Sequence, residues 1–173
     1  MEIRPIEPGD EPSLIRFFER IPDSDRTFLK EDVGDADVRA AWAAPGAARA
    51  IAVEGGEVVG SVAVVPLHGW SSHVGEVRLV VDPDQRGRGL GRMLAQRAVL
   101  DALDLELSKL VVEVIADQTA LIGMFGSLGF EPEALLLDHV RDRTGELRDL
   151  MVLANSVDQE FSAMATAGIT EQL

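Results

Sequence analysis

The spacing of apolar residues changes along this chain, and its first part predicts a short strand followed by a helix. Residues 3–6 alternate apolar and polar side chains, which is typical of an edge strand. Residues 14–21 carry Leu, Ile and Phe side chains at helical spacing. We expect Asp10 to cap this helix and Pro22 to end it, because the residue before a proline avoids helical geometry.

The following segments predict short helices and then a change to strands. Residues 27–44 are expected to form one or two short helices, capped at Asp35 and closed by Pro45-Gly46. A β-hairpin follows, since Gly55-Gly56 separates two apolar runs. The predicted strands are 47–53, 58–65, 76–81, 110–115, 133–141 and 147–153, and the later helices are 90–105 and 118–128. This order predicts a mixed α/β or α+β domain with helices packed on a central sheet.

Composition narrows the class of protein. A chain of 173 residues, 46% hydrophobic and 27% charged, fits one globular domain, expected over residues 1–154 with a tail at 155–173. There is no cysteine, and the three histidines lack metal-ligand spacing, so no metal site is expected. No run approaches the roughly 18 apolar residues of a membrane span, and the N-terminus lacks the apolar run of a signal peptide. These features favour a cytoplasmic protein with no membrane partner.

The net charge of −14 bears on the partners of the chain. It argues against nucleic acid as the main partner, because phosphates require a basic surface. It is compatible with a cationic substrate such as a lysine or polyamine, and equally with a role in solubility alone.

One segment departs from this acidic background. The strand ending at Val81 is followed by Arg-Gly-Arg-Gly-Leu-Gly at residues 86–91, which opens directly into a helix, and no acid falls between Asp84 and Asp101. Glycines let a backbone approach its ligand closely, and the first turn of a helix offers free N–H groups and positive potential. Five arginines lie in or near this segment: Arg78, Arg86, Arg88, Arg92 and Arg97. The segment therefore predicts a site for a pyrophosphate, and the alternative is a glycine-rich loop with surface arginines.

Two common nucleotide-binding motifs do not fit these glycines. A P-loop requires GxxxxGK[ST], and no lysine follows the glycines here. A dinucleotide-binding fingerprint requires GxGxxG in an early βαβ unit, whereas this spacing is GxGxG and the strand follows a β-hairpin.

The segment resembles the pyrophosphate motif Q/R-x-x-G-x-G/A of the GCN5-related N-acetyltransferase (GNAT) family, matched by Arg86-Gly87-Arg88-Gly89-Leu90-Gly91. Val-Asp-Pro-Asp at 81–84 and Leu-Gly-Phe at 128–130 also resemble the family, and the likeness covers about residues 3–153. It implies a central mixed, mostly antiparallel sheet of six to seven strands, flanked by helices and splayed between strands 4 and 5. It also implies an N-acetyltransferase with acetyl-CoA as cosubstrate and no metal.

The resemblance further implies which residues bind acetyl-CoA. The pantetheine would lie in the gap between the splayed strands, against the backbone of Leu79, Val80 and Val81. The N–H of Leu79 would face the thioester carbonyl as an oxyanion donor. Backbone amides of the pyrophosphate loop would bind the diphosphate. The loop consists of Arg86, Gly87, Arg88, Gly89, Leu90, Gly91 and Arg92. Side chains of its three arginines would reach outer phosphates.

Glu76, at the start of the strand before the motif, is the candidate general base, because some protein-acetylating members of the family have a glutamate at a similar position. The alternative is a surface carboxylate at a strand end, and His68 and His73 in the preceding loop are weaker candidates. Phe125 stands where the family often has a tyrosine as general acid, and Gln118 stands where an asparagine often begins the helix. Gln118 is expected to hydrogen-bond the cofactor. The chain has no tyrosine, but a thiol with a pKa of about 8.5 leaves tolerably as the thiolate.

Three functions remain open from the sequence. The preferred one is acetyl transfer to a small-molecule amine. The second is transfer to a protein lysine or N-terminus, favoured by a loose similarity of residues 14–32 to protein-acetylating bacterial members, and the third is a non-catalytic acetyl-CoA-binding module, favoured by the missing tyrosine. We expect the acceptor pocket between the helices of residues 14–42, the loop 67–73 and the final hairpin. Its aromatic candidates are Phe17, Phe18, Trp42 and Trp70, and a homodimer through the final hairpin and tail is a further expectation.

Overall fold

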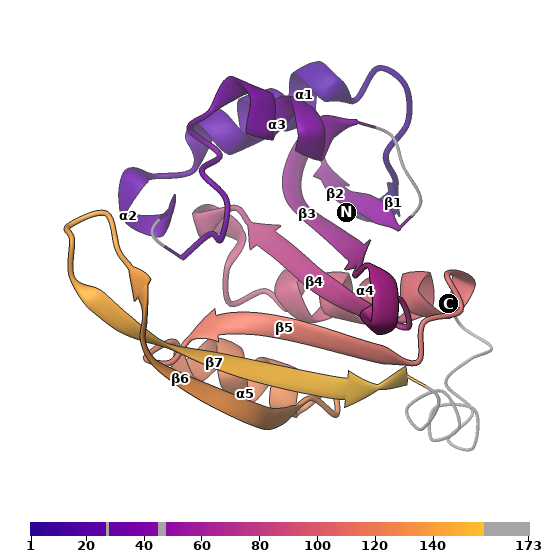
Figure 1. The fold of residues 1–173 in the computed structure, drawn as a ribbon. Coiled ribbons are helices and arrows are strands. Elements are labelled where there is room, and N and C mark those ends of the chain that lie inside the picture. Colours follow the sequence, from indigo (N-terminus) through magenta and orange to yellow (C-terminus); the bar gives the residue numbers. More distant parts are fainter. Residues whose placement is uncertain (27, 45–47, 158–173) are drawn as a thin grey trace.

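The computed structural model describes residues 1–26, 28–44 and 48–157 (Figure 1). Its helices are α1 (Glu11–Arg20), α2 (Asp23–Arg26), α3 (Ala36–Ala43), α4 (Leu90–Asp104) and α5 (Thr119–Gly126), with short 3-10 helices at Gly69–Ser71 and Pro83–Gln85. Its strands are β1 (Glu2–Pro5), β2 (Arg49–Glu54), β3 (Glu57–Pro66), β4 (Val74–Val81), β5 (Lys109–Ile115), β6 (Glu131–Arg141) and β7 (Leu147–Ser156). The predicted order of strands is confirmed, and so is that of the helices, except that α2 precedes the segment 27–44, in which α3 is the helix that the described residues form.

The strands of the described residues form one seven-stranded sheet in the order β1-β2-β3-β4-β5-β7-β6. Every neighbouring pair is antiparallel except β4 and β5, which run parallel. The expected mixed, mostly antiparallel sheet is therefore confirmed. β1 lies at one edge, as its short alternating pattern predicted, and β6 lies at the other.

Both faces of the sheet are covered, because successive side chains of a strand point to opposite faces. On β3, Val62 and Val64 contribute to the core beneath α4, whereas Ala63 between them faces the core beneath α1 and α3. Figure 1 shows α1 and α3 together on one side of the sheet and α4 on the other. The two cores fix the strands from both sides and so position the gap described below.

Several local expectations are confirmed and one is wrong. Gly55 and Gly56 turn the β2–β3 hairpin with φ of 60° and 86°, and the Asp35 side chain caps α3 by accepting from Asp37 N–H. Asp10 precedes α1 but its side chain makes no capping hydrogen bond; Arg4 instead donates two hydrogen bonds of 2.6 and 2.7 Å to its carboxylate. The ion pair with the neighbouring strand thus displaces the expected cap.

Three of the expected features concern residues outside the ranges that the structure describes. The turn at Pro45-Gly46, the strand start at residue 47 and most of the expected tail lie outside them. β7 continues to Ser156, two residues beyond the expected end of the domain at residue 154. No helix in the described part of the chain is long and apolar enough to cross a membrane.

β4 and β5 separate soon after they begin to pair. Val74, Gly75 and Glu76 pair with Lys109, Leu110 and Val111, and no pair between the two strands follows. β5 pairs with β7 along its whole length instead, and β4 pairs with β3 through Val81. The sheet therefore opens between β4 and β5 beyond Glu76, which confirms the expected splay.

Candidate active site at the splayed strands

Three cavities lie at or beside the gap between β4 and β5, and they share lining residues. The glycine-loop cavity, of about 650 Å³, lies beside the glycine loop (residues 86–92) at the N-terminus of α4. The hairpin cavity, of about 540 Å³, lies beside the β6–β7 hairpin. The central cavity, of about 80 Å³, shares Phe28 and Leu29 with both larger cavities and is called the constriction below.

The glycine loop lines its cavity with backbone as well as side chains. Gly87 and Gly89 have φ of 73° and 83°, which residues with a Cβ rarely adopt, and Gly89 is the N-cap of α4. Gly91 is already helical, and a Cβ there would lie 3.3 Å from Met124 Sδ on α5. The glycines therefore serve two purposes: two shape the turn, and the third lets α4 approach α5. Free amides at the start of a 15-residue helix suit a diphosphate, so the loop fits the acyl donor expected from the sequence.

The five arginines do not form the single cluster that their positions in sequence suggested. Arg78 contacts Glu31 and Glu76 in the central cavity, and Arg97 pairs with Asp101 within α4 at 2.7 Å. The expectation that Arg78 and Arg97 belong to the anion site is therefore wrong, because both form ion pairs elsewhere. The remaining three lie on the loop and first turn of α4, but Arg88 pairs with Glu54 on β2 and does not line the cavity. Of the five, the side chains of Arg86 and Arg92 line it.

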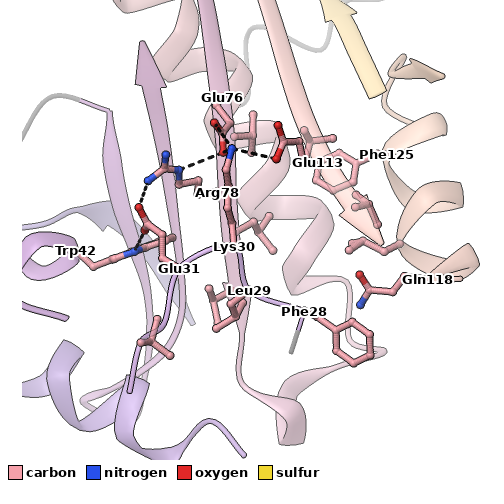
Figure 2. A pocket seen from close by; sticks show the side chains of 17 residues that line it. Phe28, Leu29, Lys30, Glu31, Trp42, Glu76, Arg78, Glu113, Gln118 and Phe125 are labelled. Carbon is pink, nitrogen blue, oxygen red and sulfur yellow. Dashed lines mark hydrogen bonds and ion pairs between the residues drawn. The ribbon is translucent and has the colours of Figure 1, made fainter. Parts of the chain in front are cut away.

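Glu76 is the last residue of β4 that pairs with β5, and it is buried, with 6% of its surface exposed. The alternative of a surface carboxylate at a strand end is therefore wrong, because the strand begins two residues earlier and Lys30, from the segment between α2 and α3, contacts this side chain. Lys30 Nζ lies 3.0 Å from both carboxylate oxygens of Glu76, and Arg78 Nε lies 3.3 Å from one of them. Figure 2 shows these side chains meeting in the central cavity.

Lys30 also reaches across the gap to β5. Its Nζ lies 3.0 Å from Glu113 Oε2, so one ammonium contacts carboxylates on both splayed strands (Figure 2). Burial by itself would lower the pKa of Lys30, but hydrogen bonds to Glu113 and Glu76 outweigh it and raise the pKa above its ordinary value. Lys30 is therefore a cation throughout the physiological range.

The other residues expected in the site occupy different parts of it. Leu79, Val80 and Gln118 line both the central and the glycine-loop cavities, and Val81 lines the latter. Phe125 lines the central cavity and packs edge-on against Phe130, with ring centroids 5.1 Å apart. The structure thus brings the strand, the glycine loop and the start of α5 around two adjoining cavities.

Some segments expected to form the acceptor pocket do line a common cavity, and others do not. Residues of the β6–β7 hairpin line the hairpin cavity together with Arg26, Phe28, Leu29, Lys30 and Asp32. The loop 67–73 lines none of the three cavities, and its Trp70 is 96% exposed. Phe17 and Phe18 are fully buried in the core, whereas Trp42 lines the central cavity.

Several polar residues of these cavities were missed from the sequence, among them Lys30, Glu31, Glu113 and His139. Glu113 could have been identified from the sequence, because it is the single charged residue inside the apolar run Leu-Val-Val-Glu-Val-Ile. Lys30 is 46 positions from its partner Glu76, and local sequence gives no indication of that contact.

Comparisons with known proteins agree with this geometry. A sequence model of the acetyltransferase (GNAT) family matches residues 15–130. The chain is 41% identical over 69 residues to mycothiol acetyltransferase from Kocuria rhizophila, a match covering 39% of this chain but only 23% of that protein. It is 27% identical over 128 residues to the uncharacterized N-acetyltransferase YjgM of Escherichia coli, covering 70% of this chain and 77% of that protein.

Solved structures share the fold over about nine-tenths of this chain. A GCN5-related N-acetyltransferase from Kribbella flavida superposes with a TM-score of 0.77 at 26% identity, covering 90% of this chain and 96% of that chain. The putative acetyltransferase yncA from Salmonella typhimurium, solved with acetyl-CoA, superposes with a TM-score of 0.76 at 22% identity, covering 91% and 94%. Because the family model spans more than half of the chain and includes the glycine loop, the chain belongs to the GNAT family of acetyltransferases.

Proposed function

We propose that this acyltransferase moves the acetyl group of acetyl-CoA directly to a primary amine, and that the acceptor is a small molecule. The observation that carries the proposal is a pair of adjoining cavities beside β4, which share Leu79, Val80 and Gln118 as lining residues. One is lined by the glycine loop at the start of α4, and the other by the buried carboxylate of Glu76.

The donor half of the site follows from the free edge of β4. Beyond Glu76 that edge has no partner strand, so its backbone groups are available to a ligand. In the proposed complex, the backbone groups of Leu79 and Val81 pair with the pantetheine, and the N–H of Leu79 stabilises the oxyanion. Val80 lies between them with its backbone toward β3, and it contributes to the lining of both cavities. Amides of the glycine loop from Arg86 to Arg92 bind the diphosphate, with Gln118 as a polar contact from α5.

The acceptor half contains the proposed base. Glu76 removes a proton from the acceptor ammonium, directly or through a water, and the amine nitrogen then attacks the thioester carbon. The new C–N bond forms, the oxyanion collapses to the amide as the C–S bond breaks, CoA leaves as the thiolate, and the amide nitrogen loses its second proton to water. Phe125 cannot supply a proton to that thiolate, which the ordinary thiol pKa of about 8.5 makes tolerable.

The size of the hairpin cavity favours a small-molecule acceptor. Its volume of about 540 Å³ lies within the range of roughly 300–1,000 Å³ typical of small-molecule sites. Protein lysines and N-termini are the second candidate class, and a test must include both.

A thiol-release assay tests the proposal. Purified protein and acetyl-CoA are incubated with a panel of small amines, amino acids, antibiotics, and peptides carrying lysine or a free N-terminus. The expected result is CoA release that depends on one class of acceptor, with the acetylated product identified by mass spectrometry. If the protein binds CoA but releases no thiol with any acceptor, the proposed transfer is wrong and the protein is a CoA-binding module without catalysis.

A further inference from the structure

The ammonium of Lys30 occupies the constriction that an acceptor must enter. Lys30 and Glu113 line both the central and the hairpin cavities, whereas Leu79 lines the central and glycine-loop cavities. An amine that arrives from the hairpin side therefore meets Lys30 before it reaches the thioester expected beside Leu79.

The charges of the constriction create a position for one cation. Three carboxylates line it, from Glu31, Glu76 and Glu113, together with two cations, Lys30 and Arg78. Arg78 is held by Glu31, whose other oxygen accepts from Trp42 Nε1. Lys30 alone bridges Glu76 and Glu113, at 3.0 Å from each. Without Lys30, Glu113 would lose the cation that it contacts, and Glu76 would keep Arg78, whose Nε lies 3.3 Å from Oε1.

Lys30 is also able to leave this position. It lies between α2 and α3 rather than within either helix, and its side chain is 47% exposed, in contrast to the 9% of the Glu76 side chain. A change of side-chain rotamer would move the ammonium toward the hairpin cavity and solvent. Glu76 and Glu113 are fixed on strands and would stay in place.

We propose that Glu76 and Glu113 together bind the ammonium group of the acceptor, and that Lys30 is a tethered occupant of this position which the acceptor displaces. The inference rests on the proposed acetyl transfer and deepens it in two ways. First, the two carboxylates select acceptors that are cationic at neutral pH. Second, Glu113 becomes a specificity residue. Displacement of Lys30 also frees Glu76 to accept the proton of the acceptor.

Kinetics with a charged and an uncharged acceptor test the selection. The probes are butylamine, which is an ammonium at neutral pH, and aniline, which is uncharged. Lys30→Met removes the competitor and should lower the KM for butylamine, while Glu113→Gln should raise it about tenfold or more, because hydrogen bonds between charged groups are strong. The KM for aniline should change in neither variant.

The second lysine of the chain provides a matched control. Lys109 pairs with Glu133 on the outside of the sheet, and Lys109→Met removes the same charge without touching the cavities. It should leave both KM values unchanged. Thermal melting of each variant separates loss of folding from loss of binding.

A measurement without turnover tests displacement directly. Because Lys30 and Lys109 are the two lysines of the sequence, ¹⁵Nζ-lysine labelling gives two ammonium signals by NMR. Butylammonium titrated into the CoA complex should move the Lys30 signal toward that of free lysine and leave the Lys109 signal in place. Glu113→Gln should weaken this response.

The outcomes distinguish this inference from the proposed function. A Lys30 signal that butylammonium does not move, or variants that change butylamine and aniline alike, would overturn the inference while acetyl transfer stands. Protein that releases no thiol with any amine would overturn the proposed function, and the NMR titration would still decide whether the two carboxylates bind an external ammonium.

Discussion

Glu76 and Val111 form the last residue pair between β4 and β5, and the two strands separate immediately beyond them. The proposed base therefore lies at the apex of the gap in which the pantetheine is proposed to lie. The Glu76 side chain is buried and still lines the central cavity. The relationship joins the fold to the proposed chemistry, because pairing that continued further would close the space.

Replacement of Glu76 by Gln should reduce turnover strongly while CoA affinity is unchanged. Loss of a positioned general base typically costs about 10²–10⁴ in rate. Steady-state kinetics with the best acceptor and calorimetry with CoA measure the two effects separately. Glu133→Gln, on an exposed carboxylate of β6, is the control and should leave turnover as in the wild type. Equal turnover in the Glu76 variant and the wild type would rule out the base.

Gly89→Ala should weaken CoA binding. A Cβ at φ of 83° costs about 1 kcal/mol of strain, and it would lie where the loop is proposed to meet the diphosphate. Gly55→Ala is a matched control, since Gly55 also has positive φ and open space around its Cβ position but lies in the β2–β3 turn. Both variants should lose similar stability to urea, and only Gly89→Ala should raise the Kd for CoA, by roughly tenfold or more. Equal Kd values for the two variants would contradict a role for this loop.

Gly75→Ala should destabilise the fold at the start of the gap. A Cβ there would lie 2.7 Å from Leu107 Cδ1 and 2.7 Å from Val64 Cγ1, both in the core. Overpacking of this kind costs about 1–3 kcal/mol of unfolding free energy, measurable by urea denaturation. Gly126→Ala, near the end of α5 with no atom within 4 Å of the added Cβ, should be neutral or slightly stabilising. If the Gly75 variant is as stable as the wild type, the core side chains rearrange to accommodate the added methyl group, and the prediction is wrong.

Acid should weaken the β6–β7 turn through Asp142. The Thr144 hydroxyl, then Glu146 N–H and the Arg148 guanidinium, donate hydrogen bonds to this carboxylate and lower its pKa from 3.8 to about 2. A lowered pKa in the folded state contributes stability that is present above pH 3.8 and is lost as the pH falls toward 2.

Asp142→Asn should remove this part of the pH dependence. Unfolding free energies at pH 7, 4 and 2.5 would show a smaller decrease in the variant than in the wild type, and a lower value for the variant at pH 7. Parallel decreases in both proteins would mean that Asp142 has the same pKa folded and unfolded.

The sequence predicted the local parts of this molecule well, because they depend on neighbouring residues. Gly55-Gly56 identified a hairpin, Asp35 a helix cap, and the GxGxG run a turn into a helix. Expectations failed where a distant residue intervened. Arg4 from β1 binds Asp10, and Glu31 draws Arg78 away from the glycine loop.

The centre of the site was the least predictable part. Lys30, Glu76 and Glu113 come from three segments that meet only because the sheet splays and the α2–α3 segment covers the gap. No periodicity or motif in the sequence predicts that these three side chains lie together. Glu76 was identified through its place before the motif, and its burial and its cationic partners became visible in the structure.

The central claim is that main-chain amides at the start of α4 bind the diphosphate of CoA. Isothermal titration of the wild-type protein with CoA, and then with pantetheine, which has no diphosphate, tests it most directly. The account predicts measurable binding of CoA and affinity for pantetheine weaker by about a hundredfold or more, because charge-assisted hydrogen bonds are lost. Equal affinities for the two compounds, or no binding of CoA, would contradict it.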